Sequence, residues 1–179
     1  MDINMPVKVT IAQFSISIGD TQRNWSSGMS AIRQAADESS RLIQLPELWI
    51  SGYDLSNCEG HSRNEGEYAG ELQHLADRYD LAIGGSMITL QNGVFFNSYH
   101  LFVPGQKLSH RYQKTHLFKL LDETRYFAPG ESLTTVDLGW GTVGLAICYD
   151  VRFPELVRAY ANRGVECLLV AAQWGMKRK

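Results

Sequence analysis

The segment Thr142–Val157, TVGLAICYDVRFPELV, constrains the fold of this chain more than any other. Its apolar, β-branched run over 143–147 predicts a short buried strand. Cys148 follows that strand directly, and Pro154 suits the first turn of a helix because it needs no amide partner there. A thiol near a helix N-terminus lies at the positive end of the helix dipole, which favours the nucleophilic thiolate. The alternative is that Cys148 is only a small buried hydrophobic residue.

The overall composition is typical of a globular domain and argues against several classes of function. The 179 residues are 44% hydrophobic and 20% charged, which suits one sizeable domain. The formal net charge of -2 gives no reason to expect a nucleic-acid partner. No apolar run approaches the length of a membrane span, and the first residues lack the pattern of a signal peptide. The basic run at 177–179 is expected to be a solvated tail.

The cysteines and histidines follow no metal-binding pattern. Cys58, Cys148 and Cys167 are odd in number and lack both metal-type spacing and a disulfide framework. With no signal peptide evident, this predicts a reducing, cytoplasmic location. The five histidines form no H-x-H or H-E-x-x-H pattern and are interpreted as ordinary surface or core residues. We therefore expect no metal.

The periodicity of apolar residues predicts a mixed fold in which strands and helices alternate at both ends of the chain. The expected strands are 7–14, 42–45, 81–87, 94–103, 107–112, 133–138, 142–147 and 166–171. Helices are expected after the cap residue Asp20, over 65–79, and over 153–164 with Gly164 as the C-cap. The segment 116–130 is expected to be an irregular loop. Helix-covered sheets of mixed direction, in α/β or α+β layers, fit this order.

Three of the predicted strands are each followed by one reactive side chain. Glu47 follows strand 42–45, Lys114 follows strand 107–112, and Cys148 follows strand 142–147. A carboxylate, an ammonium group and a thiol suit acyl transfer, as general base, oxyanion partner and nucleophile respectively. Taken singly, a Glu or Lys after a strand is more often a solvated loop residue, and spacing alone does not decide between these interpretations.

The local motifs around these side chains do decide it. The segments LPELWISGYD, RYQKTHLF and GLAICYDVRFPEL resemble, in this order, the three signature motifs of the nitrilase superfamily of carbon–nitrogen hydrolases. The resemblance extends to the opening VTIAQF strand, to the helix start marked by Gly19, Asp20 and Asn24, and to the loop from Glu123 to Gly130. It therefore covers essentially the whole chain, and three motifs in register are far more specific than any one alone.

The resemblance implies the αββα sandwich of this superfamily and a reaction without a cofactor. Glu47 would be the general base, Lys114 the transition-state stabiliser and proton donor, and Cys148 the nucleophile. Glu123 would help to position the substrate and Lys114. The main-chain N–H of Tyr149 would be a second oxyanion donor. The thiol would attack an amide carbon, ammonia would leave, and the general base would activate water against the resulting thioester.

The residues after the cysteine, YDVRFPE, resemble the amidase branch, which includes the omega-amidases that hydrolyse 2-oxo acid amides. Nitrilases usually carry Trp-Glu at this point, and carbamoylases an Asn-Asp-Arg pattern. The candidate substrate-binding residues are Tyr53, Tyr149 and Arg152. Arg152 could hold a substrate carboxylate, or it could form a structural ion pair with Glu155 or Asp150. A nitrile hydrolase and a catalytically inactive relative are the alternative functions.

We expect residues 1–179 to form a single carbon–nitrogen hydrolase domain that lacks the usual C-terminal part. The sequence ends at QWGMKRK, where members of the superfamily continue with a helix and further strands. This predicts exposed apolar surface or strand edges, and reduced stability or activity of the isolated chain. The resemblance also implies a small-molecule amide substrate and a homodimer or higher homo-oligomer.

Overall fold

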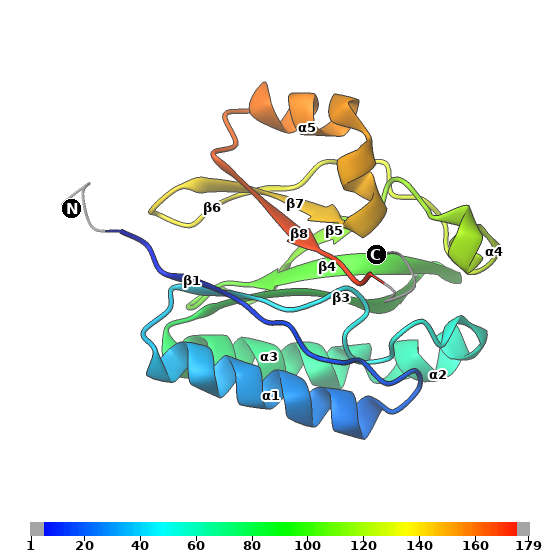
Figure 1. The fold of residues 1–179 in the computed structure, drawn as a ribbon, viewed down its shortest axis with the longest axis horizontal. Helices are drawn as coiled ribbons and strands as arrows, with labels where there is room; N and C mark the ends of the chain where they lie inside the picture. The colour runs from blue at the N-terminus through cyan, green and yellow to red at the C-terminus, as the bar shows by residue number, and fades with distance from the viewer. Residues whose placement is uncertain (1–5, 175–179) are drawn as a thin grey trace.

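The computed structural model describes residues 6–174, which fold into four layers. Figure 1 shows two long helices beneath a five-stranded sheet, a three-stranded sheet stacked on its other face, and helix α5 (Pro154–Ala161) above that second sheet. The αββα arrangement expected from the sequence is therefore confirmed. The basic run at 177–179 lies outside the described residues.

The larger sheet mixes parallel and antiparallel pairing, in the order β1-β2-β3-β4-β5. The first three strands are parallel, whereas β3, β4 and β5 pair antiparallel. The strands are β1 (Val9–Ile11), β2 (Leu42–Gln44), β3 (Ala82–Gln91), β4 (Val94–Phe102) and β5 (His110–Gln113). All three residues of β2 are buried, because helices cover one face of the sheet and the second sheet covers the other.

The smaller sheet carries the cysteine. It consists of β6 (Thr135–Asp137), β7 (Thr142–Ile147) and β8 (Cys167–Ala171), with β7 in the centre. Helix α5 connects β7 to the parallel strand β8. The two sheets pack face to face through apolar side chains that include Leu42 and Leu101 of one sheet and Leu145 and Ile147 of the other. This packing brings the ends of β2, β5 and β7 into one region.

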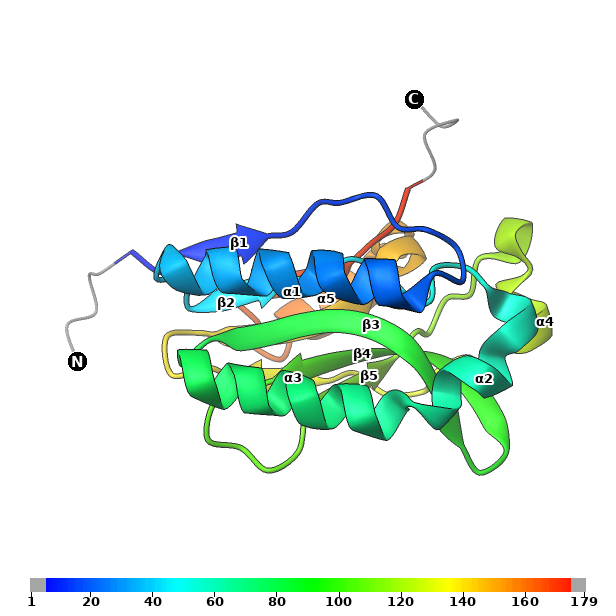
Figure 2. The ribbon, with the colours of Figure 1, turned by 90° about the horizontal axis from the view of Figure 1, so that it is seen from below.

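The helices cover the outer faces of the sandwich. The α-helices are α1 (Thr21–Asp37), α2 (Cys58–Arg63), α3 (Glu65–Tyr79), α4 (Glu123–Tyr126) and α5, and the 3-10 turns are η1 (Leu55–Asn57), η2 (Lys119–Leu121) and η3 (Cys148–Arg152). Figure 2 shows α1 and α3 side by side across the larger sheet. The side chain of Asp20 accepts a hydrogen bond from Arg23 N at 3.1 Å and caps α1, as expected. No helix within residues 6–174 is long and apolar enough to span a bilayer.

Most predicted elements are present, but several of their limits were wrong. The strand expected over 7–14 is limited to Val9–Ile11, because β1 pairs only with the three residues of β2. The helix expected over 153–164 ends at Ala161 and is capped by Asn162, so Gly164 instead occupies the following turn with φ +74°. The segment 116–130 is not wholly irregular, because it contains η2 and α4. Helix α2 was not predicted.

Helix α1 approaches the loop after β2 so closely that only glycine fits at one position. A Cβ added to Gly28 would lie 2.2 Å from Cζ3 of the buried Trp49 ring. Gly28→Ala should therefore lower the free energy of unfolding by about 1–3 kcal/mol, measured by urea titration. The matched control is Gly70→Ala in α3, where an added Cβ meets nothing within 4 Å. It should stabilise by about 0.5–1 kcal/mol. Equal effects of the two substitutions would contradict this packing.

Candidate active site

Lys114 lies at the centre of a fully buried cluster of charged side chains. Its Nζ donates hydrogen bonds to Glu47 Oε1 at 2.8 Å and to Glu123 Oε1 at 2.7 Å, and none of the three side chains is exposed. Lys114 follows β5, and its main-chain N–H bonds to Asn97 O of β4 at 2.9 Å. The carbonyl oxygen of Lys114 accepts a hydrogen bond from the main-chain N–H of Gly130. No side chain fits at Gly130, because an added Cβ would lie 2.2 Å from the carbonyl oxygen of Gln113. Main-chain bonds on both sides therefore fix the lysine.

A tight turn after β2 presents Glu47. Leu48 has a left-handed backbone with φ +44°, which is uncommon for a non-glycine residue. Its N–H donates to Ser86 Oγ of β3 at 2.8 Å, which ties the turn to the neighbouring strand. Glu47 Oε1 also accepts from Asn97 Nδ2 at 2.9 Å, and Oε2 accepts from Gln173 N at 3.3 Å. These bonds fix the plane of the carboxylate.

Glu123 reaches the lysine from the loop between the two sheets. It is the first residue of α4, and its Oε2 accepts from Phe118 N at 2.7 Å. Its Oε1 accepts from Tyr53 Oη at 3.1 Å as well as from the lysine. A buried carboxylate with three donors is well satisfied. The structure therefore brings Glu123 and Tyr53 together with the two residues Glu47 and Lys114.

Cys148 lies at the C-terminal end of β7, where the chain turns into η3. Its φ of +41° is strained for a residue with a side chain, and such strain is typical of functional positions. The residue is 8% exposed, and Sγ lies 3.9 Å from Gln173 O. All three cysteines are free thiols. The main-chain N–H of the same Gln173 bonds to Glu47 Oε2, and the charges of Glu47 and Lys114 both act on the Cys148 thiol, so Cys148 lies beside the cluster.

The expectation that the environment of Cys148 favours a thiolate was wrong. Burial and the adjacent Glu47 carboxylate raise the pKa of the Cys148 thiol to about 12. A 3-10 turn, rather than the first turn of α5, follows the cysteine, so the expected helix dipole does not offset these effects. Burial also raises the pKa of Glu47, although Lys114 opposes this shift. A more basic carboxylate is better suited to accept the thiol proton.

The charge on Lys114 is maintained by its two carboxylate partners. Burial alone would lower the pKa of Lys114, but the charges of Glu47 and Glu123 outweigh burial and raise it. The lysine is therefore a cation at neutral pH.

Within residues 6–174, no group of three or more His, Cys, Asp or Glu side chains could hold a metal ion.

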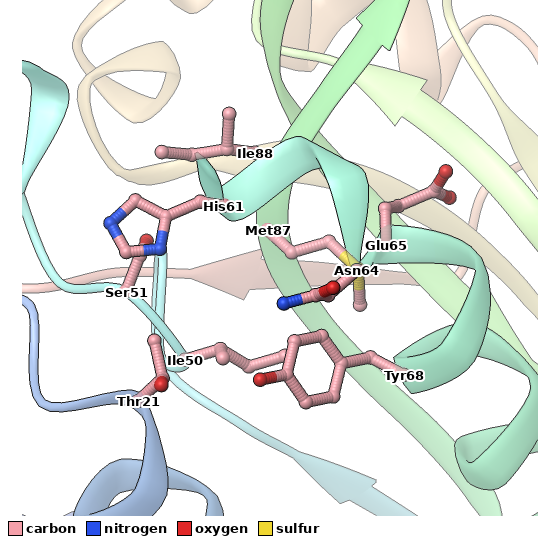
Figure 3. A pocket seen from close by; sticks show the side chains of 9 residues that line it. All are labelled: Thr21, Ile50, Ser51, His61, Asn64, Glu65, Tyr68, Met87 and Ile88. Carbon is pink, nitrogen blue, oxygen red and sulfur yellow. The ribbon is translucent and has the colours of Figure 1, made fainter. Parts of the chain in front are cut away.

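A cleft of about 660 Å³ opens beside Cys148 and is large enough for a small organic molecule. Its walls are mostly apolar or aromatic and are formed by Ile18, Tyr53, Phe118, Leu120, Leu121, Cys148, Tyr149, Arg152, Gln173 and Trp174. A second cavity, between α2, α3 and β3, is shown in Figure 3 with His61 and Tyr68 among its lining side chains. Its volume of about 20 Å³ suits a single water molecule, whereas the cleft reaches Cys148 and is therefore the candidate substrate site.

The three candidate substrate-binding residues, Tyr53, Tyr149 and Arg152, all line the cleft. The Arg152 guanidinium lies over the ring of Trp174, 5.6 Å from its centroid. Among residues 6–174, Arg152 forms no ion pair with Glu155 or Asp150, so the structural alternative for this arginine was wrong. The arginine is exposed and, of the residues within 6–174 that line the cleft, it is the one that carries a positive charge.

Sequence reasoning missed two residues that contact the cluster. Asn97 is fully buried in β4 and donates to Glu47, and the main-chain atoms of Gln173 contact both Glu47 and Cys148. A buried asparagine within the apolar run of β4 was the available signal for Asn97. Gln173 offered no signal, because its contacts use only main-chain atoms.

Comparison with known proteins identifies the family. The profile of the carbon-nitrogen hydrolase family matches residues 8–179. The chain belongs to the carbon-nitrogen hydrolase family. The chain is 32% identical in sequence to the 2-oxoglutaramate amidase of Bacillus subtilis, and the match covers 95% of this chain and 66% of that protein.

Solved structures of the nitrilase superfamily share this fold. Saccharomyces cerevisiae Nit3, a member of branch 10 of the superfamily, aligns with a TM-score of 0.85 and 28% identity over 96% of this chain and 66% of its own. A variant of the amidase from Nesterenkonia sp. AN1 aligns with a TM-score of 0.85 and 26% identity, over 93% of this chain and 67% of its own. In that amidase, acrylamide has added to the active-site cysteine. The chain spans about two thirds of the length of these relatives.

Removing the buried cation should destabilise the fold in a pH-dependent way. Lys114→Met leaves Glu47 and Glu123 buried without their partner, and should lower the free energy of unfolding by about 3–5 kcal/mol. Burial already raises the pKa of Glu47, and loss of the cation should raise it further. A carboxyl whose pKa is raised by folding stabilises at low pH and loses that contribution as pH rises. The loss of stability should therefore be larger near pH 8 than near pH 5.

Urea titrations at the two pH values would measure this difference. The control is Lys8→Met, which breaks an ion pair of the same 2.8 Å length between half-exposed side chains. This control should change the midpoint little, because exposed ion pairs contribute little. A pH-independent loss in Lys114→Met would show that the carboxylates are not the source of the instability.

Proposed function

We propose that this family member hydrolyses the C–N bond of a small amide through a thioester on Cys148, with release of ammonia. The observation that carries the proposal is the burial of Lys114 between Glu47 and Glu123 beside a thiol at the end of a substrate-sized cleft. Its similarity to a 2-oxoglutaramate amidase supports an amide over a nitrile as the substrate. The reaction needs no cofactor.

In the first half-reaction, Cys148 Sγ attacks the amide carbon and its proton passes to Glu47. Glu47 Oε1 already accepts two hydrogen bonds, from Lys114 and Asn97, so Oε2 is the oxygen better placed to take the proton. An ammonium group has three donors, and the carboxylates use two of those of Lys114. The third donor and the main-chain N–H of Tyr149 stabilise the oxyanion.

The tetrahedral intermediate then collapses. The C–N bond breaks, the leaving nitrogen takes a proton delivered by Glu47 or Lys114, and ammonia departs from the thioester. In the second half-reaction, Glu47 takes a proton from water, and the resulting hydroxide adds to the thioester carbon. The C–S bond breaks, and the thiolate recovers the proton. The net reaction converts one amide and one water into one carboxylic acid and one ammonia.

The cleft favours an amide that carries a carboxylate at its far end, such as the amide of a 2-oxo dicarboxylic acid. Arg152 is a cation without an ion-pair partner among the described residues, and it lines the same cleft as Cys148. A guanidinium binds a carboxylate with two parallel hydrogen bonds. The apolar walls formed by Phe118 and Leu121 would contact the chain between the two functional groups. Self-association into a homodimer or a higher homo-oligomer stays a prediction.

The proposed activity is tested by ammonia release. The purified chain should release ammonia from 2-oxoglutaramate and from butyramide, and Cys148→Ala should release none above the uncatalysed rate. Butyronitrile, which has the same carbon chain, tests the alternative reaction. Ammonia from the nitrile alone would replace the amidase proposal with a nitrile hydrolase. No ammonia from any of the three would contradict activity of this chain.

The role of Arg152 is tested by comparing two amides. Arg152→Met should raise KM for 2-oxoglutaramate by about 10- to 100-fold, because a hydrogen bond to a charged group contributes about 1.5–3 kcal/mol. The same substitution should leave KM for butyramide, which lacks a carboxylate, within about twofold. Equal losses for both amides would show that the arginine shapes the cleft instead of binding a carboxylate.

A further inference from the structure

Asp150 is a buried carboxylate that accepts four hydrogen bonds and takes no direct part in the proposed chemistry. Its side chain has no exposed area. Oδ1 accepts from the main-chain N–H of His116 at 2.9 Å and from His116 Nδ1 at 2.9 Å. Oδ2 accepts from Tyr112 Oη at 2.8 Å and from the main-chain N–H of Ile147 at 2.9 Å. Every acceptor position of the carboxylate is therefore used.

Three of these bonds connect the segment that carries the nucleophile to the segment that carries the lysine, and the fourth joins Asp150 to Ile147 within the nucleophile's own segment. Ile147 is the residue directly before Cys148 and lies at the end of the smaller sheet. Tyr112 and His116 lie two residues before and two residues after Lys114, on the strand and loop of the larger sheet. One side chain thus bridges the main chains on both sides of the sandwich, next to both reacting groups.

The neighbouring contacts hold this bridge in one geometry. The His116 ring stacks on Phe153 with centroids 3.6 Å apart and planes 9° apart, which orients Nδ1 toward Asp150. Burial and the nearby Asp150 charge raise the pKa of Tyr112, so this tyrosine remains a hydrogen-bond donor. The left-handed φ of Cys148 is strained and needs fixed neighbours on both sides.

We propose that Asp150 is a positioning residue that sets the distance between Cys148 and Lys114 by joining the Ile147 and His116 main chains. The expected effect on turnover rests on the proposed function. The expected effect on the position of Cys148 relative to Lys114 does not. A shift of about 1 Å between reacting groups can lower a rate about 100-fold. Loss of the bridge should therefore lower kcat more than it raises KM, because the cleft walls remain in place.

Asp150→Asn is the sharpest test because it preserves size while removing one acceptor. An asparagine offers one oxygen and one NH₂ group. If the NH₂ group replaces Oδ1, it faces the main-chain N–H of His116, and if it replaces Oδ2, it faces the main-chain N–H of Ile147. Neither main-chain donor can become an acceptor. One half of the bridge is lost in either orientation.

We expect Asp150→Asn to lower kcat for amide hydrolysis about 10- to 100-fold, with KM changed less than about threefold. The control for general destabilisation is Leu72→Ala in α3, a buried core residue outside the cleft. At a temperature well below both unfolding midpoints, Leu72→Ala should keep the kcat of the unsubstituted chain. If Asp150→Asn keeps kcat within twofold, or if Leu72→Ala loses as much activity, the positioning role is wrong.

A second readout separates this inference from the proposed function. In a Cys167→Ser background, which removes the exposed thiol, alkylation of Cys148 by iodoacetamide is followed by mass spectrometry. Asp150→Asn should change the alkylation rate at least about fivefold, and Leu72→Ala should leave it unchanged. If no variant releases ammonia but the alkylation rate responds in this way, the proposed function fails and the positioning role stands. Unchanged alkylation overturns the positioning role.

Tyr112→Phe covers the case in which Asp150→Asn does not fold. It removes one of the four bonds and leaves both main-chain bonds to Asp150 in place. We expect a loss in kcat of about 2- to 10-fold, smaller than that of Asp150→Asn, with an alkylation rate that shifts in the same direction. A Tyr112→Phe chain that matches the unsubstituted chain in both measurements would contradict the bridge.

Discussion

Lys114 is the group on which the arrangement of the site depends, because its buried ammonium must be balanced by carboxylates from two other segments. Glu47 comes from the turn after β2 and Glu123 from the loop that joins the two sheets, and both lie within 2.8 Å of Nζ. An unpaired charge in the same position would be strongly destabilising. The ion cluster therefore fixes three separate segments relative to one another, and it does so beside the thiol of Cys148.

The four-layer fold allows such a cluster to be buried. The larger sheet ends at the turn that carries Glu47 and at Lys114, and the smaller sheet ends at Cys148. Face-to-face packing of the sheets excludes water from these ends on one side, while the cleft leaves them accessible to a small molecule on the other. The same burial raises the pKa of both the Glu47 carboxyl and the Cys148 thiol.

Polar groups around the cluster hold its side chains in place through contacts that the sequence did not predict. Asn97 and Gln173 fix the Glu47 carboxylate, and Tyr53 contacts Glu123. Asp150 forms the corresponding support for the cysteine turn. The bonds to Glu47 and Glu123 join residues that are distant in sequence, whereas Asp150 and Ile147 are three residues apart. A buried polar group left without such a partner would be unfavourable. This is why the neighbourhood of the site is polar within an otherwise apolar core.

The sequence by itself indicated the order of most elements, because apolar periodicity is a local property. Its three motifs carried the resemblance that implied the αββα fold and that proposes Glu47, Lys114 and Cys148 as the reactive side chains. Only the tertiary structure decided where elements end, as at Ala161 of α5 and in the short strand β1, because pairing and capping partners set those limits. It also decided the protonation state of Cys148. A thiol near a helix N-terminus is expected to ionise readily, but burial and the adjacent Glu47 carboxylate raise the pKa of the Cys148 thiol instead. Glu47 and Cys148 are far apart in the sequence, so no local sequence pattern predicts that the carboxylate lies beside the thiol.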